Sequence, residues 1–262
     1  MIREFFVNEV PKLLFKQFGL IHNIFILLPI IVIIIMYIKR NKITTIPKEK
    51  SKKILKIGAI ILLLNMIIFT FGFLYYGVFD YTKHLPLHLC FIANYMFMFG
   101  ILFEKESILK MTFFLSFIGP IPAILWPDMV STIDNFEWWQ YVISHHVFTC
   151  LSFFSYYAYN YRITIKDYIK VFIFTNFLML IMYPFNLTFN TNYIFSTEIP
   201  ANVMSLYPWL KYFPPMITLE VVGLAISGAI YYFLIRKRNL ELEAISSKEK
   251  ITKKKTSNKK IK

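Results

Sequence analysis

Seven long apolar stretches constrain the fold of this chain more than any other feature. Each is close to the roughly 20 residues that a helix needs to cross a hydrocarbon layer of about 30 Å. None alternates apolar and polar residues with the two-residue period of a barrel strand. The sequence therefore predicts an all-α polytopic membrane protein, a bundle of seven transmembrane helices. The stretches cover residues 20–38, 57–76, 85–103, 108–126, 138–159, 168–185 and 213–235.

The composition agrees with a membrane protein. Of the 262 residues, 57% are hydrophobic and only 17% are charged, which excludes an ordinary soluble domain. The first apolar stretch is too long for a signal peptide, and no cleavage motif of small residues follows it, so we expect it to remain in the protein. Ile, Lys, Asn and Phe are abundant, as in products of AT-rich bacterial genes.

The basic residues gather in alternate connecting segments. Of the 29 Lys and Arg residues, 24 lie in segments 39–56, 104–110, 161–170 and 236–262. Since cytoplasmic loops carry an excess of Lys and Arg, this pattern predicts an external N-terminus and a cytoplasmic C-terminus. The net charge of +14 therefore reflects topology, and we expect no nucleic-acid partner.

The same pattern predicts one membrane domain with two flanking segments. Residues 1–19 form an external segment, residues 20–235 the transmembrane domain, and residues 236–262 a basic cytoplasmic tail that we expect to be disordered. The two cysteines, Cys90 and Cys150, lie at different depths in their apolar stretches, so we expect free thiols.

Ionisable residues gather in the predicted outer third of the membrane. Such residues are costly in lipid and mark a functional site or a buried pair. His88 and Cys90 lie near the outer edge of the third stretch, His145 lies within the fifth and Glu220 within the seventh. Asp128 lies just outside the fourth. We therefore predict a polar pocket that is open to the outer leaflet.

A thiol beside an imidazole is typical of a nucleophilic site, in which a carboxylate can orient the imidazole. On a regular helix His88 and Cys90 point about 200° apart. Either the helix is distorted after Pro86, or only one of the two faces the pocket. His146 points about 100° away from His145, and we assign it and Cys150 to packing.

One further reading of the polar residues, a metal site, competes with this one. His84 and His88 share a helical face and are suited to a divalent cation, but the fifth stretch offers only two adjacent, divergent histidines. We therefore expect no metal and no other cofactor. The external segment 186–212 is rich in aromatic residues and predicts a structured lid.

Five short motifs carry a resemblance to a known family. Their order and spacing, over roughly residues 55–235, resemble the YwaF-like bacterial integral membrane family, which is related to eukaryotic transmembrane protein 164. The motifs are LPLHLC at 85–90, PD at 127–128, QYVISH at 140–145, NTNYIF at 190–195 and PWLKYFP at 208–214.

The resemblance implies a seven-helix protein of the bacterial cell membrane with a catalytic Cys and His. The eukaryotic relatives are phospholipid acyltransferases in which a cysteine is the candidate acyl acceptor. Carried over, Cys90, His88 and His145 match the catalytic motif residues. Asp128 matches the aspartate of PD, and Asn192 and Tyr193 match the outer-loop pair. The chain departs from its bacterial relatives at His146, where they usually carry a small residue.

We predict acyl transfer between membrane phospholipids, in which His145 deprotonates Cys90, and Asn192 and Tyr193 stabilise the oxyanion. One alternative is a small-molecule transporter or ligand-binding receptor, with Asn65 or Asn176 lining its route. Another is a structural protein whose polar groups only pair helices. A thiol within about 4–5 Å of an imidazole favours catalysis. The sequence does not determine the oligomeric state.

Overall fold

The chain is helical throughout the part that the structure describes, and that part contains no strand. The structure is a computed structural model. It describes residues 2–7, 13–130, 132–244 and 247. The predicted all-α class is confirmed.

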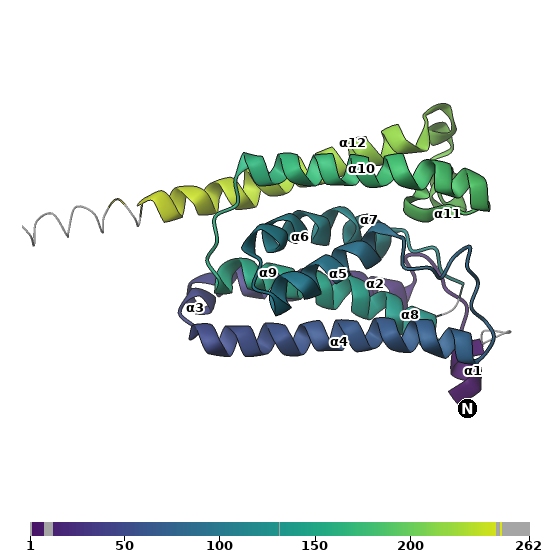
Figure 1. Cartoon of the computed structure of the whole chain (residues 1–262), viewed down its shortest axis with the longest axis horizontal. Helices are drawn as coiled ribbons and strands as arrows, with labels where there is room; N and C mark the ends of the chain where they lie inside the picture. The colour runs from purple at the N-terminus through teal and green to yellow at the C-terminus, as the bar shows by residue number, and fades with distance from the viewer. Residues whose placement is uncertain (1, 8–12, 131, 245–246, 248–262) are drawn as a thin grey trace, which may run out of the picture.

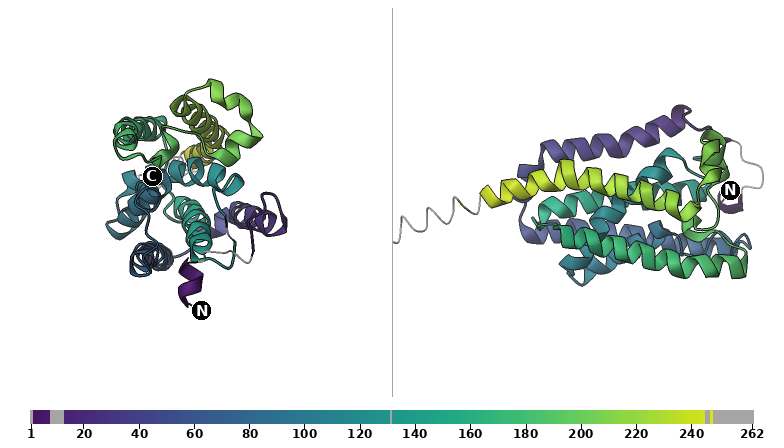
Figure 2. Two further views of the ribbon diagram at one scale, coloured as in Figure 1. Left: turned by 90° about the vertical axis from the view of Figure 1, so that its right-hand side faces the viewer. Right: turned by 90° about the horizontal axis from the view of Figure 1, so that it is seen from above.

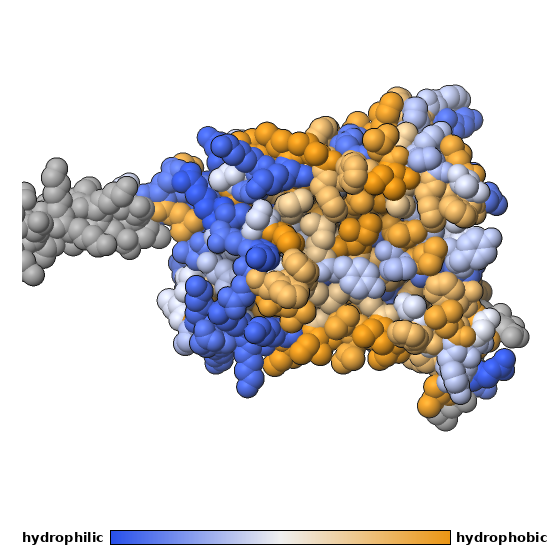
Figure 3. Space-filling model, viewed as in Figure 1, coloured by the Kyte–Doolittle hydropathy of each residue, from blue (hydrophilic) through white to orange (hydrophobic). Residues whose placement is uncertain are grey.

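Five helices are long and apolar enough to cross a membrane. On the face seen in Figure 3, an apolar belt of hydrophobic residues covers the middle of the molecule, hydrophilic residues gather at the end where the tail emerges, and the opposite end is mixed. The protein is therefore a membrane protein. The five are α2 (Leu20–Ile38), α4 (Lys48–Tyr75), α6 (Glu106–Ile118) joined to α7 (Pro120–Leu125), α10 (Ile165–Phe189), and a helix over Pro215–Ala244 that begins with α12 (Pro215–Ile230).

The other two predicted spans are shorter or interrupted. The third corresponds to α5 (Leu89–Leu102), whose 14 residues begin after His88 rather than at Leu85. The fifth is divided into α8 (Phe136–Val142), a π-helical turn η1 (Ile143–Val147) and α9 (Phe148–Ala158). The total of seven spans and their orientation remain predictions.

The helices form a bundle in which α6 connects two groups (Figures 1 and 2). On one side α6 packs against α5 and α9, and α4 covers the far face of these two helices. On the other side α10 and α12 both pack against α6. In α2, in α10 and in the helix over Pro215–Ala244, only 11%, 22% and 6% of the most apolar segment is buried within the chain, so these helices present most of their side chains to lipid.

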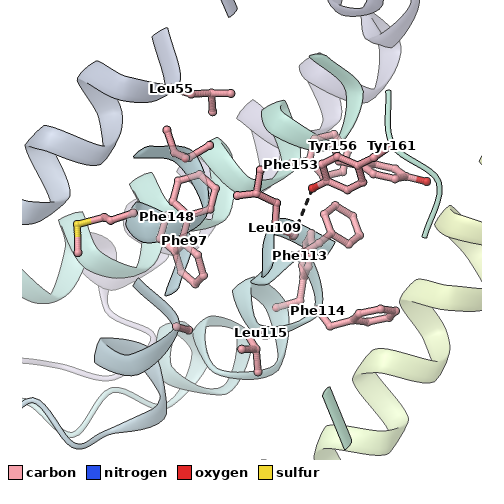
Figure 4. Close-up of a cluster of buried hydrophobic side chains, with 14 of the residues drawn as sticks. Leu55, Phe97, Leu109, Phe113, Phe114, Leu115, Phe148, Phe153, Tyr156 and Tyr161 are labelled. Atoms are coloured by element: carbon pink, nitrogen blue, oxygen red, sulfur yellow. Dashed lines mark hydrogen bonds between the residues drawn. The ribbon is translucent and has the colours of Figure 1, made fainter. Parts of the chain in front are cut away.

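Large rings fill the core between α6 and α9 (Figure 4). Phe113, Phe153 and Tyr156 are almost fully buried, and the ring centroids of Phe113 and Tyr156 are 4.5 Å apart. Phe148 and Phe97 extend this cluster toward α5. Because packed aromatic side chains bury large areas, this core fixes how α5, α6 and α9 pack together.

Short helices close the two ends of the bundle. At the end with the predicted outer loops, the ring of Phe6 in α1 (Ile2–Val7) stacks on Phe136 at a centroid distance of 4.6 Å. The long loop after α10 contains three short helices. These are η2 (Tyr193–Phe195), α11 (Ala201–Leu206) and η3 (Pro208–Tyr212). At the opposite end α3 (Arg40–Thr44) packs against α9.

The last helix extends into the predicted tail, since it continues to Ala244. Arg238 and Asn239 are buried there. The Arg238 guanidinium donates to Asn160 Oδ1 at 2.6 Å, and Asn239 Nδ2 donates to the Ile163 carbonyl at 2.7 Å. These contacts attach the helix to the segment between α9 and α10. The predicted disorder therefore does not hold for the start of the tail, and residues 248–262 lie outside the described residues.

Candidate functional site

The π-helical turn that carries His145 is the framework of the candidate site. A π-turn interrupts the regular helical hydrogen bonds, so some main-chain carbonyls need other donors. Asn65 Nδ2 in α4 donates to the Gln140 carbonyl at 3.1 Å, and Asn94 Nδ2 in α5 donates to the Ser144 carbonyl at 3.1 Å. Both asparagines are buried. Side chains from two neighbouring helices thus hold the turn in place.

The hydrogen bond of His145 fixes its tautomer. His145 Nδ1 lies 2.7 Å from the Tyr141 carbonyl, and its ring lies 4.1 Å from the Tyr141 ring, centroid to centroid. Because a carbonyl only accepts, Nδ1 carries the proton and Nε2 keeps its lone pair. No hydrogen bond to Nε2 is formed within the described residues. His145 therefore presents a proton acceptor.

His88 has the opposite tautomer. The Ile194 main-chain N–H donates to His88 Nδ1 at 3.3 Å, so Nε2 must carry the proton. The imidazole lies between the rings of Tyr193 and Phe195, at centroid distances of 5.0 and 5.2 Å. His88 therefore presents an N–H donor, while His145 presents a lone pair.

The start of α5 removes the geometric conflict between His88 and Cys90. His88 is the N-cap residue, with extended backbone angles of φ −67° and ψ 149°. It lies outside the helix, so the helical spacing that would separate the two side chains does not apply. The predicted distortion near Pro86 is a delayed helix start.

Cys90 lies in the first turn of α5 and is free, as is Cys150, which confirms the prediction of two free thiols. The main-chain N–H groups of Cys90 and Phe91 lie within reach of the Cys90 sulfur. These groups have no partner inside the helix, and the N-terminal end of a helix carries partial positive charge. Both features favour negative charge on the sulfur, whereas its burial in apolar surroundings opposes such charge.

Tyr141 and Asn94 connect the thiol with the histidines. Tyr141 interacts electrostatically with Cys90 and with Asp128, and its ring packs on His145. Asn94 Nδ2 donates both to the Cys90 carbonyl, at 2.8 Å, and to the residue before His145. His145 also interacts electrostatically with His88. Cys90, His88 and His145 therefore occupy one neighbourhood.

The residues of this neighbourhood differ in exposure, and His145 is buried. Cys90, His88 and Tyr141 all keep part of their surface accessible, and Asp128 is exposed at its rim. Within the described residues no hydrogen bond joins the Cys90 thiol to an imidazole. Asn94 thus joins the first turn of α5, which carries Cys90, to the π-helical turn, which carries His145.

Glu220, which the sequence places in the polar pocket, is hydrogen-bonded to a residue of a neighbouring helix. Its Oε2 accepts a hydrogen bond from Asn176 Nδ2 at 3.2 Å, which joins α12 to α10. The Asn176 amide thus provides the Glu220 carboxylate with a hydrogen-bond donor inside an apolar segment. Glu220 therefore pairs two helices, and within the described residues it forms no hydrogen bond with either histidine.

Asn192 and Tyr193 direct their donors into their own surroundings. Asn192 Nδ2 donates to the Glu198 carbonyl at 2.9 Å, and the Tyr193 hydroxyl donates to the Tyr81 carbonyl and accepts from Leu85 N–H. Both residues fix the loop against the segment that leads into α5. The Asn192 amide and the Tyr193 hydroxyl thus already have partners, and the oxyanion role of this pair stays a prediction.

Asn186 is the residue at the centre of this loop that sequence reasoning missed. Its Nδ2 donates to the Tyr193 carbonyl and to Ser196 Oγ, both at 2.8 Å, and its Oδ1 accepts from the Tyr193 N–H at 2.9 Å. Only 1% of Asn186 is exposed. An amide in an apolar helix was the available signal for Asn186, as it was for Asn65 and Asn94.

His84 has a structural role beside the site. Asp80 N–H donates to His84 Nδ1 at 2.8 Å, and burial lowers the pKa of His84, so the ring is neutral. Hydrogen bonds from Thr82 lower the pKa of Asp80, which stabilises the same turn. Within the described residues no group of three or more His, Cys, Asp or Glu side chains is placed to hold a metal ion.

Comparison with protein families gives a match to the model of the TMEM164 family over residues 16–231. The chain belongs to the TMEM164 family. The match includes every residue of the candidate site and also α2, which precedes the motifs that carry the resemblance in the sequence. No curated protein and no solved structure matches the chain.

A proline explains why this TMEM164-family chain carries a histidine next to His145. Pro29 lies inside α2 and has no N–H, so the carbonyl of Phe25, four residues earlier, loses its helical donor. His146 Nε2 lies 2.7 Å from that carbonyl and donates to it. His146 therefore joins the π-helical turn to α2 and points away from the candidate site.

We expect His146→Phe to lower the free energy of unfolding by about 1–3 kcal/mol, because the Phe25 carbonyl loses the donor that replaces its helical partner. In a Pro29→Ala background the alanine supplies the helical N–H, so the same substitution should cost less than half as much. Thermal or denaturant unfolding of the four variants in detergent measures this coupling. Equal costs in the two backgrounds would contradict the assignment.

Proposed function

We propose that this protein is an acyltransferase that moves acyl chains between membrane lipids through Cys90. The observation that carries the proposal is the pair of opposite tautomers near the thiol. His145 presents a lone pair for a proton, and His88 presents an N–H for an oxyanion. Acyl transfer needs both functions beside a nucleophile.

In the first half of the reaction the Cys90 sulfur attacks the ester carbonyl of a donor phospholipid. A free thiolate is costly in an apolar interior, so His145 Nε2 takes the thiol proton as the S–C bond forms. His88 Nε2–H donates to the carbonyl oxygen while it carries negative charge. The ester C–O bond then breaks, and His145 returns the proton to the leaving oxygen.

In the second half a lipid hydroxyl replaces the lysolipid. His145 Nε2 takes the hydroxyl proton as the oxygen attacks the thioester carbonyl, and His88 again donates to the oxyanion. The C–S bond breaks, the proton passes to the sulfur, and an ester of the second lipid leaves. No oxidant, reductant or water is consumed.

We further propose that the chain belongs to the YwaF-like bacterial branch of this family and resides in the cell membrane as seven spans, with the N-terminus outside. This topology places Cys90 near the outer leaflet. Acyl-CoA is absent from that side, which favours a phospholipid as the acyl donor.

Ligand binding without catalysis is the second candidate. It is favoured by the Oδ1 atoms of Asn65 and Asn94, which are buried and have no hydrogen-bond partner within the described residues. These acceptors lie beside the π-helical turn and suit a bound hydroxyl group. A ligand that binds equally well before and after loss of the Cys90 thiol distinguishes this candidate from the first.

Reconstitution tests the proposed activity. The full chain is placed in vesicles that contain a phospholipid with a labelled acyl chain and an unlabelled lysophospholipid. We expect the label to appear in the product of the acceptor lipid, in proportion to protein and without acyl-CoA. Vesicles in which the label stays on the donor, across several acceptor classes, would contradict the proposal.

A further inference from the structure

A cavity of about 410 Å³ lies at the end of the molecule opposite the candidate site. It is formed by the first three turns of α4 and by Glu104, in the turn between α5 and α6. It is a groove that is largely open to its surroundings rather than an enclosed pocket. Figure 3 shows hydrophilic residues at this end of the molecule, bordering the apolar belt.

The lining of the cavity changes from charged to apolar along one face of α4. Lys53, Lys56, Ile57 and Ile60 follow one another at spacings of three, one and three residues, so they share a helical face. About half of the surface of each isoleucine is exposed, although both lie in a membrane-spanning helix. The two lysines therefore lie where the charged end of α4 meets its apolar part.

The acidic residues of the cavity are held by a third lysine. Lys52 Nζ lies 2.9 Å from Glu104 Oε1 and 3.7 Å from Glu49 Oε1. Lys53 and Lys56 are exposed and form no salt bridge within the described residues, although Lys56 interacts electrostatically with Glu104. Two ammonium groups thus remain available to an anion.

We propose that this cavity binds the phosphate of an anionic phospholipid, with Lys53 and Lys56 at the headgroup and Ile57 and Ile60 along an acyl chain. Free phosphate could also bind to the two ammonium groups. It would make no apolar contact with the two exposed isoleucines, whereas a lipid acyl chain would. The order of charged and apolar residues along α4 matches the order of headgroup and chain in a lipid. The site does not depend on the proposed acyl transfer.

Native mass spectrometry of the full chain in neutral detergent tests the site, with phosphatidylglycerol, phosphatidylcholine and inorganic phosphate as probes. A lysine near an anionic headgroup contributes roughly fivefold to affinity. The double variant Lys53→Gln/Lys56→Gln should therefore bind phosphatidylglycerol about twentyfold more weakly than the unmodified protein. The matched control Lys42→Gln/Lys166→Gln removes two exposed lysines of other segments and should change binding by less than about twofold.

A variant that binds phosphatidylglycerol more tightly provides a second test, because a misfolded protein would not gain affinity. Glu104→Gln releases Lys52 and removes a negative charge from the cavity, so phosphatidylglycerol should bind roughly fivefold more tightly. The proposal would be overturned if both double variants lost the same affinity for phosphatidylglycerol. It would also be overturned if the unmodified protein bound phosphatidylcholine as tightly as phosphatidylglycerol. Displacement of phosphatidylglycerol by millimolar inorganic phosphate would overturn the lipid assignment and identify a free-phosphate site.

Discussion

Replacing Cys90 with alanine should reduce the rate of acyl transfer at least about a thousandfold, because the covalent intermediate forms on its sulfur. Cys150→Ala is the matched control. Cys150 is also a free, half-buried thiol, but it lies in α9 beyond the π-helical turn. We expect this control to keep the rate within about twofold. Initial rates in the reconstituted vesicles measure both variants.

The acyl chain on the protein provides the direct observation. Brief incubation with labelled donor, in the absence of acceptor, should leave one acyl group on Cys90 that hydroxylamine removes. Label on Cys150, or full transfer by the Cys90→Ala variant, would show that the thiol of Cys90 is not the acyl acceptor. Melting curves of the variants must agree with that of the unmodified protein, so that a loss of rate is not a loss of fold.

We expect glutamine in place of His88 to restore part of the acyl-transfer rate that alanine removes, and glutamine in place of His145 to restore none of it. His145→Ala should lower the rate by about 10²–10⁴, because the general base is lost, and His145→Gln should be equally slow since an amide is not a base. His88→Ala should lower the rate by about 10²–10³ through loss of an oxyanion donor. His88→Gln retains an N–H donor at a similar position and should recover about tenfold.

The comparison of the four histidine variants isolates the roles of the two rings. Rates with saturating donor lipid separate a change in chemistry from a change in binding. If His145→Gln had a higher rate than His145→Ala, the His145 ring would act only as a hydrogen-bond donor or through packing, and not as a base. If His88→Gln kept its fold but was as slow as His88→Ala, His88 would not be the donor to the oxyanion.

Much of the site was predictable because polar residues are rare in apolar stretches. Cys90, His88 and His145 stand out by type alone, and their similar depth predicts that they meet. The prediction of helices rests on the same apolar length rule, which holds for α2, α4, α10 and the other long helices.

The partners of polar residues could not be predicted, because they depend on packing between distant segments. Glu220 shares the predicted depth of the site but faces Asn176 across α10 and α12. Asn192 matches a motif, yet its amide holds its own loop. The start of α5 was missed because Leu85 and Leu87 are as apolar as a helix requires, while the hydrogen bonds of Tyr193 hold that segment outside the helix.

The shortness of α5 has a consequence for the membrane around it. Fourteen helical residues span only about 21 Å, compared with a hydrocarbon layer of about 30 Å. In the proposed topology the charged turn at Glu104 and Lys105 lies at one boundary of the hydrocarbon layer, so we expect the Cys90 sulfur to lie below the other boundary. We therefore expect the proposed acyl transfer to be faster in thinner bilayers, because hydrophobic mismatch would bring lipid esters closer to the sulfur there.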